Sequence, residues 1–106
     1  MLKIKIAKSF FSRFMGLMGK ESLPRETGLL IAPCQSIHMM FMRFSIDAVY
    51  IDKNFVIKKI VPNLRTWTGI SICINAWGVI EINAGEAERL NLKVGEKLSF
   101  EILNEN

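Results

Sequence analysis

Apolar and polar residues alternate over several stretches of this chain with the two-residue period of β-strands. At the amino terminus, Leu2, Ile4 and Ile6 alternate with lysines, which is typical of a strand with one face in water. Short apolar runs bounded by Gly, Pro or Asn are typical of buried strands. Together these patterns predict strands at 2–6, 29–32, 37–44, 47–52, 55–61, 77–82 and 97–103.

Apolar residues at helical spacing predict two short helices. In the first, Phe10, Phe14 and Leu17 share one face, and Ser9 is suited to cap the amino-terminal end. The second helix is expected at 84–90. Many short strands with two small helices favour an α+β fold, in which a β-rich rolled sheet or a partly open barrel carries the helices.

The length and composition agree with one domain spanning residues 1–106. A chain of 106 residues that is 50% apolar can bury a core of its own. No run approaches the ~20 apolar residues of a membrane-spanning helix. The amino terminus lacks the apolar core of a secretory signal, and only two cysteines are present. We therefore expect a cytoplasmic protein with reduced thiols and no membrane span.

The net charge of +4 does not indicate a nucleic-acid-binding protein. The lysines and arginines are spread along the chain and interleaved with glutamates, whereas a nucleic-acid interface gathers its cations on one face. We therefore expect no specific nucleic-acid partner. The sequence leaves the oligomeric state open, and the partner is expected to be a small molecule or a protein.

The segment 34–47 concentrates polar and reactive side chains in apolar surroundings. It contains the only histidine, His38, together with Cys34, Arg43 and Asp47. Charged groups among methionines and phenylalanines need partners, since burying them unpaired costs several kcal/mol. Arg43 is therefore expected either to meet a carboxylate, with Asp47 and Glu81 as the candidates, or to bind an anionic ligand.

Two residues outside this segment are also candidates. Glu81 interrupts the apolar strand predicted at 77–82, so it is either half of a salt bridge or a site residue. Trp67 lies in an irregular stretch and either plugs the core or anchors a ligand, because aromatic residues on loops are good binding anchors. The first hypothesis is thus a binding domain whose cleft holds a small polar or anionic ligand or a peptide. The residues expected to line the cleft are His38, Arg43, Asp47, Trp67 and Glu81.

Cys34 supports a second hypothesis, a cysteine-dependent hydrolase or transferase with His38 as the base. On one strand these residues would stand ~13 Å apart at ~3.3 Å per residue, so the pair requires a tight bend between them. The alternative is a small buried thiol. A zinc site made of Cys34, His38 and Cys73, with Asp47 as an optional fourth ligand, lacks the usual ligand spacing, so neither a metal nor another cofactor is expected.

A third hypothesis is a protein-interaction or assembly accessory module. The segment 39–42 contains three methionines, and such side chains form adaptable contact surfaces. Either this segment or an exposed strand edge would dock another protein. The sequence leaves open whether the protein is an enzyme.

The order and spacing of several short motifs carry a family resemblance, although each motif alone is weak. They are Gly16-Leu17-Met18, Gly28-Leu29-Leu30, Cys34-x-Ser36-Ile37-His38, Met42-Arg43-Phe44-x-Ile46-Asp47, Asn63-Leu64-Arg65-x-Trp67, and Ile80-Glu81-Ile82-x-Ala84-Gly85 followed by Gly95-Glu96. The set resembles the domain of unknown function family 192, small proteins of bacteria and archaea. The resemblance implies an α+β fold with a curved, barrel-like sheet, and it supplies no activity. Two positions depart from it, since Ser45 stands where relatives often have Pro and Glu96 where Asp is more usual.

Overall fold

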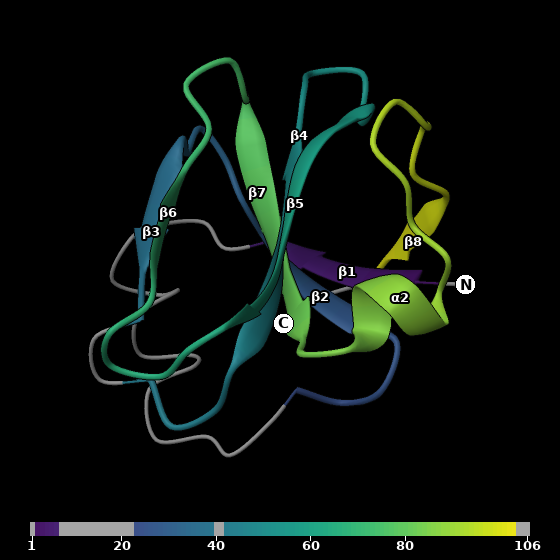
Figure 1. Cartoon of the computed structure of the whole chain (residues 1–106). Coiled ribbons are helices and arrows are strands. Elements are labelled where there is room, and N and C mark those ends of the chain that lie inside the picture. Colours follow the sequence, from purple (N-terminus) through teal and green to yellow (C-terminus); the bar gives the residue numbers. More distant parts are fainter. Residues whose placement is uncertain (1, 7–22, 40–41, 104–106) are drawn as a thin grey trace.

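Two sheets contain all the strands of the computed structural model, which describes residues 2–6, 23–39 and 42–103 (Figure 1). The larger sheet has six strands in the order β5-β4-β7-β2-β1-β8, and the smaller one pairs β3 with β6. The elements are β1 (Leu2–Ile6), β2 (Thr27–Ile31), β3 (Ser36–His38), β4 (Ile46–Ile51), β5 (Ile57–Leu64), β6 (Ile70–Ile72), β7 (Gly78–Asn83), α2 (Glu86–Arg89) and β8 (Phe100–Ile102).

The six-stranded sheet is mixed and open. Strand β1 runs parallel to both β2 and β8, whereas β2, β4, β5 and β7 pair in antiparallel fashion. Every residue of β4 is buried, as are the first five of β7, because both faces of these central strands are covered. The outermost strands, β5 and β8, remain edges. The edge position of β5 is consistent with its Lys58, Lys59 and Pro62, which discourage further strand pairing.

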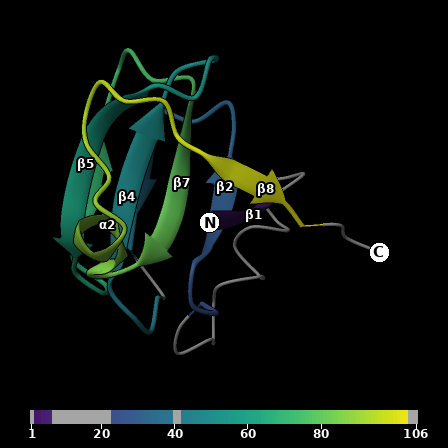
Figure 2. The same cartoon turned by 90° about the vertical axis from the view of Figure 1, so that its right-hand side faces the viewer.

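Each face of the large sheet has its own apolar core. On one face, Ile46, Ala48 and Tyr50 pack beneath the β3–β6 sheet. On the other face, Val49 and Ile51 pack with the residues around α2 and the segment before β8. Figure 1 shows the β3–β6 sheet and α2 on opposite sides of the large sheet, and Figure 2 shows α2 beside β4 and β5. In the part of the chain that is described, no helix has the length and apolarity to cross a bilayer.

The sequence predicts the β-rich mixed character correctly, but the sheet is open rather than barrel-like. One helix, α2, is found among the described residues within the range predicted at 84–90, so the count of two helices is not confirmed. The other helix, expected around Phe10–Leu17, lies outside those residues. Strands at 2–6, 29–32, 47–52, 55–61 and 77–82 are confirmed, with end positions shifted by at most three residues.

Two predicted strands are too long. The strand expected at 37–44 ends at His38, because the carbonyl of Met39 accepts hydrogen bonds from the backbone N–H groups of Met42 and Trp67 and turns the chain. The strand expected at 97–103 contributes only β8, since Lys97 instead bridges Val56 next to β5. Strand β6 is absent from the predicted set.

Candidate functional site

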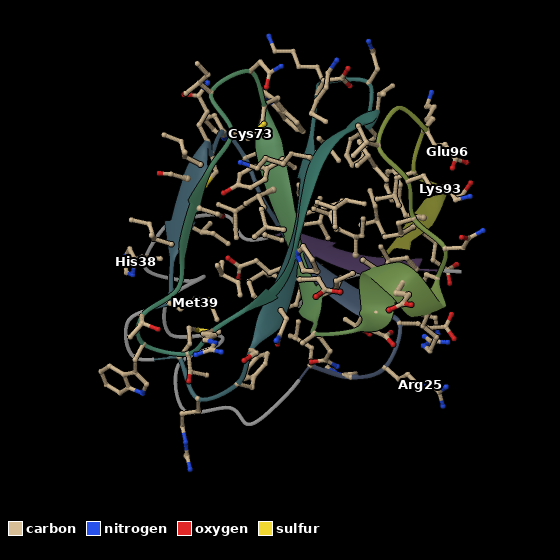
Figure 3. All side chains as sticks on the ribbon, in the orientation of Figure 1. Arg25, His38, Met39, Cys73, Lys93 and Glu96 are labelled. Atoms are coloured by element: carbon tan, nitrogen blue, oxygen red, sulfur yellow. The ribbon has the colours of Figure 1, made fainter. Side chains whose placement is uncertain are left out.

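The β3–β6 sheet places alternate residues inside and outside the molecule. Its antiparallel register pairs Ile37 with Ser71, and both of these side chains are buried against the large sheet. The flanking pairs, Ser36 with Ile72 and His38 with Ile70, are exposed. Figure 3 shows His38 pointing away from the six-stranded sheet.

The burial of Ser71 in place of its isoleucine neighbours follows from Tyr50, which is fully buried on β4. The Tyr50 and Ser71 hydroxyl oxygens lie 2.7 Å apart, and their hydrogen bond satisfies both groups. Cys73, just after β6, is buried as Ser71 is, and its thiol donates a hydrogen bond to the Oδ1 of Asn75 at 3.1 Å. Small polar side chains therefore fill the space above the tyrosine ring, and Ile70 and Ile72 face solvent.

Tyr50 is expected to stay protonated in the folded protein above the pH at which a free tyrosine ionises. Burial raises its pKa above the ordinary value of 10.0, while the hydrogen bond with Ser71 opposes this in part. Because the folded form disfavours tyrosinate, the stability that depends on neutral Tyr50 is full below pH ~10 and is lost as the pH rises further.

The absorbance of tyrosinate tests this directly, since Tyr50 is the only tyrosine of the chain. We expect the absorbance step to coincide with alkaline unfolding followed by circular dichroism, and the denatured protein to titrate near pH 10. Ionisation near pH 10 with an unchanged native dichroism signal would contradict the buried position of this ring.

Three isoleucines at alternate positions form the most exposed apolar feature of the described chain. Ile70, Ile72 and Ile74 have 75%, 56% and 75% of their surface exposed. Ile70 and Ile72 lie on β6, and Ile74 continues the alternation into the turn after this strand. The buried residues Ser71 and Cys73 lie between them in sequence. Exposed apolar residues that occur singly are ordinary, whereas a row of them on one strand is a candidate interaction surface.

Trp67 lies in the loop that leads into this row. Its backbone N–H donates to the carbonyl of Met39, next to His38, at 2.9 Å. Its side chain is 56% exposed, and its φ of +65° places the residue in the left-handed region. A bulky residue adopts that region rarely and at a cost of about 1–2 kcal/mol. Such strain is concentrated at functional sites, where it holds a side chain in a required position.

Asp47 lies on the opposite face of the large sheet from this surface. It is 1% exposed, its Oδ1 accepts the backbone N–H of Asn63 at 2.8 Å, and its Oδ2 accepts those of Gly85 and Ala87 at 3.0 and 2.9 Å. The carboxylate therefore caps the start of α2 and holds the end of β5. Both carboxylate oxygens of Asp47 thus accept hydrogen bonds from backbone N–H groups.

Glu81 is buried beneath the β3–β6 sheet, at 3% exposure, between Leu29 and Ala48 in the register of the large sheet. Since Ala48 follows Asp47 on β4, Glu81 and Asp47 point to opposite faces. Arg43 is exposed, and both Arg43 and Glu81 have partners within the chain. The structure thus brings His38 and Trp67 together at the surface, and it does not bring Asp47 and Glu81 to that surface.

Cys34 lines an open hollow of about 680 Å³ at the other end of the isoleucine row. Its thiol donates to the carbonyl of Ser36 at 3.1 Å, while His38 lies farther along β3 with its side chain in solvent. A nucleophile and its base need to be within hydrogen-bond reach, and this arrangement does not provide that contact. The hollow is lined by Pro33, Cys34, Gln35, Asp52, Lys53, Ile74, Asn75, Ala76 and Trp77.

No metal-binding group is evident in the described part of the chain, where no three His, Cys, Asp or Glu side chains gather. Cys34 and Cys73 are both free thiols. The surface presents an apolar row, an exposed indole, an imidazole and an open hollow.

Comparison with known proteins agrees with the family resemblance of the sequence. The model of the family described as Uncharacterized ACR, domain of unknown function family 192, matches residues 1–100. The chain belongs to this family. A relative named UPF0127 protein in Pyrococcus horikoshii is 33% identical over 92% of this chain and 87% of its own length. Its counterpart in Thermococcus sibiricus is 32% identical over 97% of this chain and 69% of its own length.

Two crystal structures share the fold of the family member described here. One is a protein of unknown function from Novosphingobium aromaticivorans, with a TM-score of 0.77 and 23% identity over 89% of this chain and 71% of the other. The second is a proposed transcription regulator from Sinorhizobium meliloti, with a TM-score of 0.80 and 22% identity over 91% of this chain and 79% of the other. At this level of identity the likeness concerns the fold alone.

The sequence-based site omits the isoleucine row. A signal was present, because the run Ile70-Ser-Ile-Cys-Ile74 has the strict two-residue alternation of a strand. The usual interpretation of such a run would place its isoleucines in the core. The isoleucines instead face solvent, because Ser71 is turned inward to form a hydrogen bond with the buried Tyr50.

Proposed function

We propose that this protein is a non-catalytic binding domain, and that the outer face of its β3–β6 sheet binds a segment of polypeptide. The observation that carries this proposal is the exposure of Ile70, Ile72 and Ile74 beside an exposed Trp67. A folded chain gains by burying such side chains, so their joint exposure on an ordered strand favours a role in contact with a partner.

The contacts available on this face suit an extended peptide. Alternate residues of a β-strand repeat every ~6.6–6.8 Å, so apolar residues at alternate positions of an extended partner would match the isoleucine row in spacing. Trp67 and His38 would contribute an aromatic anchor and a hydrogen-bonding group at one end of the row. The hollow beyond Ile74 offers room for a side chain at the other end.

The enzyme hypothesis is less well supported by the geometry. The Cys34 thiol donates to a backbone carbonyl, and His38 takes no part in that hydrogen bond. A small polar ligand held by carboxylates is also less favoured as the main occupant, because Asp47 is bound by backbone groups on the far face and Glu81 is buried. Of the five residues expected at the cleft, we propose His38 and Trp67 as direct contacts.

Selection from a phage-displayed library of random peptides tests the proposal. We expect selected clones to bind the wild-type protein and to lose at least about tenfold in affinity toward an Ile70→Ser, Ile74→Ser variant. The fold should be retained, since exposed substitutions change stability little. The matched control is Val94→Ser, Ile102→Ser, which removes two side chains of 59% and 56% exposure elsewhere. Clones that bind all three proteins equally would contradict the proposal.

A further inference from the structure

One cation is fixed beside the exposed row, and two further cationic residues lie near its ends. The Nζ of Lys59 donates to the carbonyl of Ile72 at 2.8 Å, which fixes an ammonium group at the edge of β6. Arg65 is exposed and accepts, through its carbonyl, the N–H of Gly69, the residue before Ile70. Lys53 lines the same hollow as Ile74. All three cations come from β5 or from the turns at its two ends.

Carboxylates are scarce around this surface. From residue 42 to residue 74 the chain carries five Lys and Arg residues but only two Asp residues, and one of these, Asp47, is buried on the other face. The second, Asp52, accepts the backbone N–H groups of Val56 and Asn54 through one oxygen, and its other oxygen lies 3.8 Å from Lys58. The backbone hydrogen bonds from Val56 and Asn54 hold the pKa of Asp52 below its usual value. Within residues 42–81, Asp52 is the one carboxylate that reaches solvent, since Asp47 and Glu81 are buried, and this leaves an excess of positive charge at the surface.

The acidic residues that follow β7 belong to the opposite half of the molecule. Glu86 is bound there by Arg89 at 2.6 Å, and Glu88, Glu96 and Glu101 lie on α2, before β8 and on β8. Figure 3 shows Glu96 on the far side of the large sheet from His38. The carboxylates of that half lie among cations such as Arg25, Arg89 and Lys93, whereas the segment 42–74, which carries the apolar row, has an excess of cations.

We propose that the polypeptide bound by this face combines apolar residues at alternate positions with acidic residues between or beside them. The inference rests on the proposed function and adds the charge of the partner. An acidic segment would satisfy the three cations along the row while its apolar residues cover the isoleucines. Complementary charge of this kind favours the correct partner and speeds its association.

The same features argue against other occupants. Two copies of this chain meeting face to face would bring like charges together. Four exposed side chains also offer only a few hundred Å², well below the ~800 Å² per partner of a stable protein–protein interface. Trp67 could stack on one base at most, whereas single-stranded nucleic-acid sites stack successive bases on several aromatic side chains. Asp52 and Lys53, which line the hollow at the end of the row, are charged and therefore unsuited to burial in a lipid bilayer.

Three synthetic peptides that alternate valine with glutamate, with lysine or with serine test the inference by fluorescence anisotropy. We expect the glutamate peptide to bind at least about tenfold more tightly than the lysine peptide, and this advantage to shrink in high salt. A Lys59→Gln, Arg65→Gln variant should lose most of the advantage and keep its affinity for the serine peptide. The control is Arg25→Gln, Lys93→Gln, which removes two cations on the side away from His38 (Figure 3).

The outcomes separate the inference from the proposed function. Equal affinity for the three peptides, lost in the Ile70→Ser, Ile74→Ser variant, would overturn the charge preference and leave the binding face in place. Absence of any binding that depends on this face would overturn both. Tighter binding of phosphatidylserine vesicles or of single-stranded oligothymidylate than of the glutamate peptide would overturn the inference and assign the surface to a different partner.

Discussion

Replacement of Asp47 by alanine is expected to leave the protein close to unfolded. The change removes the acceptor of three backbone N–H groups, those of Asn63, Gly85 and Ala87. A buried donor left without a partner costs about 1–3 kcal/mol; the Ala87 donor is buried and the other two are partly buried, so the total is about 3–5 kcal/mol. The whole stability of a domain of this size is about 5–15 kcal/mol. We therefore expect a fall in Tm of at least about 15 °C, or no cooperative transition.

Asp52 supplies the matched control for this change. It also accepts two backbone N–H groups through its carboxylate, but its side chain is 27% exposed, so water can replace the lost bonds. Asp52→Ala should therefore lower the Tm much less than Asp47→Ala does. Asp47→Asn, which retains one carbonyl oxygen but turns an NH₂ group toward backbone donors, should fall between the two. Equal losses for Asp47→Ala and Asp52→Ala, measured by thermal unfolding, would show that Asp47 does not hold α2 to the sheet.

Gly69→Ala is expected to impair both the stability and the proposed binding surface. A Cβ at this position would lie 2.5 Å from the carbonyl oxygen and 2.9 Å from the backbone nitrogen of Arg65. Backbone atoms cannot move aside as a side chain can, so the turn at 65–69 must open and break the Gly69–Arg65 hydrogen bond. Overpacking of this kind costs about 1–3 kcal/mol. The opening would displace Trp67, and we expect the affinity for selected peptides to fall at least about tenfold.

Gly95→Ala separates the effect on the site from a general cost of replacing glycine. Gly95 has a φ of +93°, and a Cβ added there would meet nothing within 4 Å, so alanine incurs conformational strain without a clash. Its cost should be about 1–2 kcal/mol. The binding of selected peptides should be unchanged, since Gly95 pairs with Ile57 away from β6. Loss of binding in both variants would mean that the turn at 65–69 has no special role.

The sequence predicts the central sheet well, because its strands obey simple rules. The apolar run 48–51 of β4 and the alternation of β1 both favour strands, and no competing interaction alters them. Boundaries shift where side chains and backbone form specific bonds. Met39 ends β3 by accepting two backbone N–H groups, and that contact depends on Trp67, which is distant in sequence.

The candidate site is only partly predictable for a similar reason. His38 and Trp67 stand out by residue type, and the structure places both on one surface. Asp47 also stands out, but residue type alone does not show that distant backbone groups surround its carboxylate. Ile70 and Ile72 look like core residues, and their exposure follows from the contact between Tyr50 and Ser71. Which face of a strand points toward the core depends on such partners, which are distant in sequence.

Mapping of backbone-amide NMR shifts on adding a selected peptide tests the central claim most directly. The account predicts that the perturbed amides are those of β3, of Trp67 and its loop, and of Ile70 to Ile74, together with the indole N–H of Trp67. The cavity of about 390 Å³ on the other side, lined in part by Leu90, Lys93 and Ser99, serves as the internal reference and should not respond. Shifts centred on that cavity, with β6 unchanged, would contradict the account.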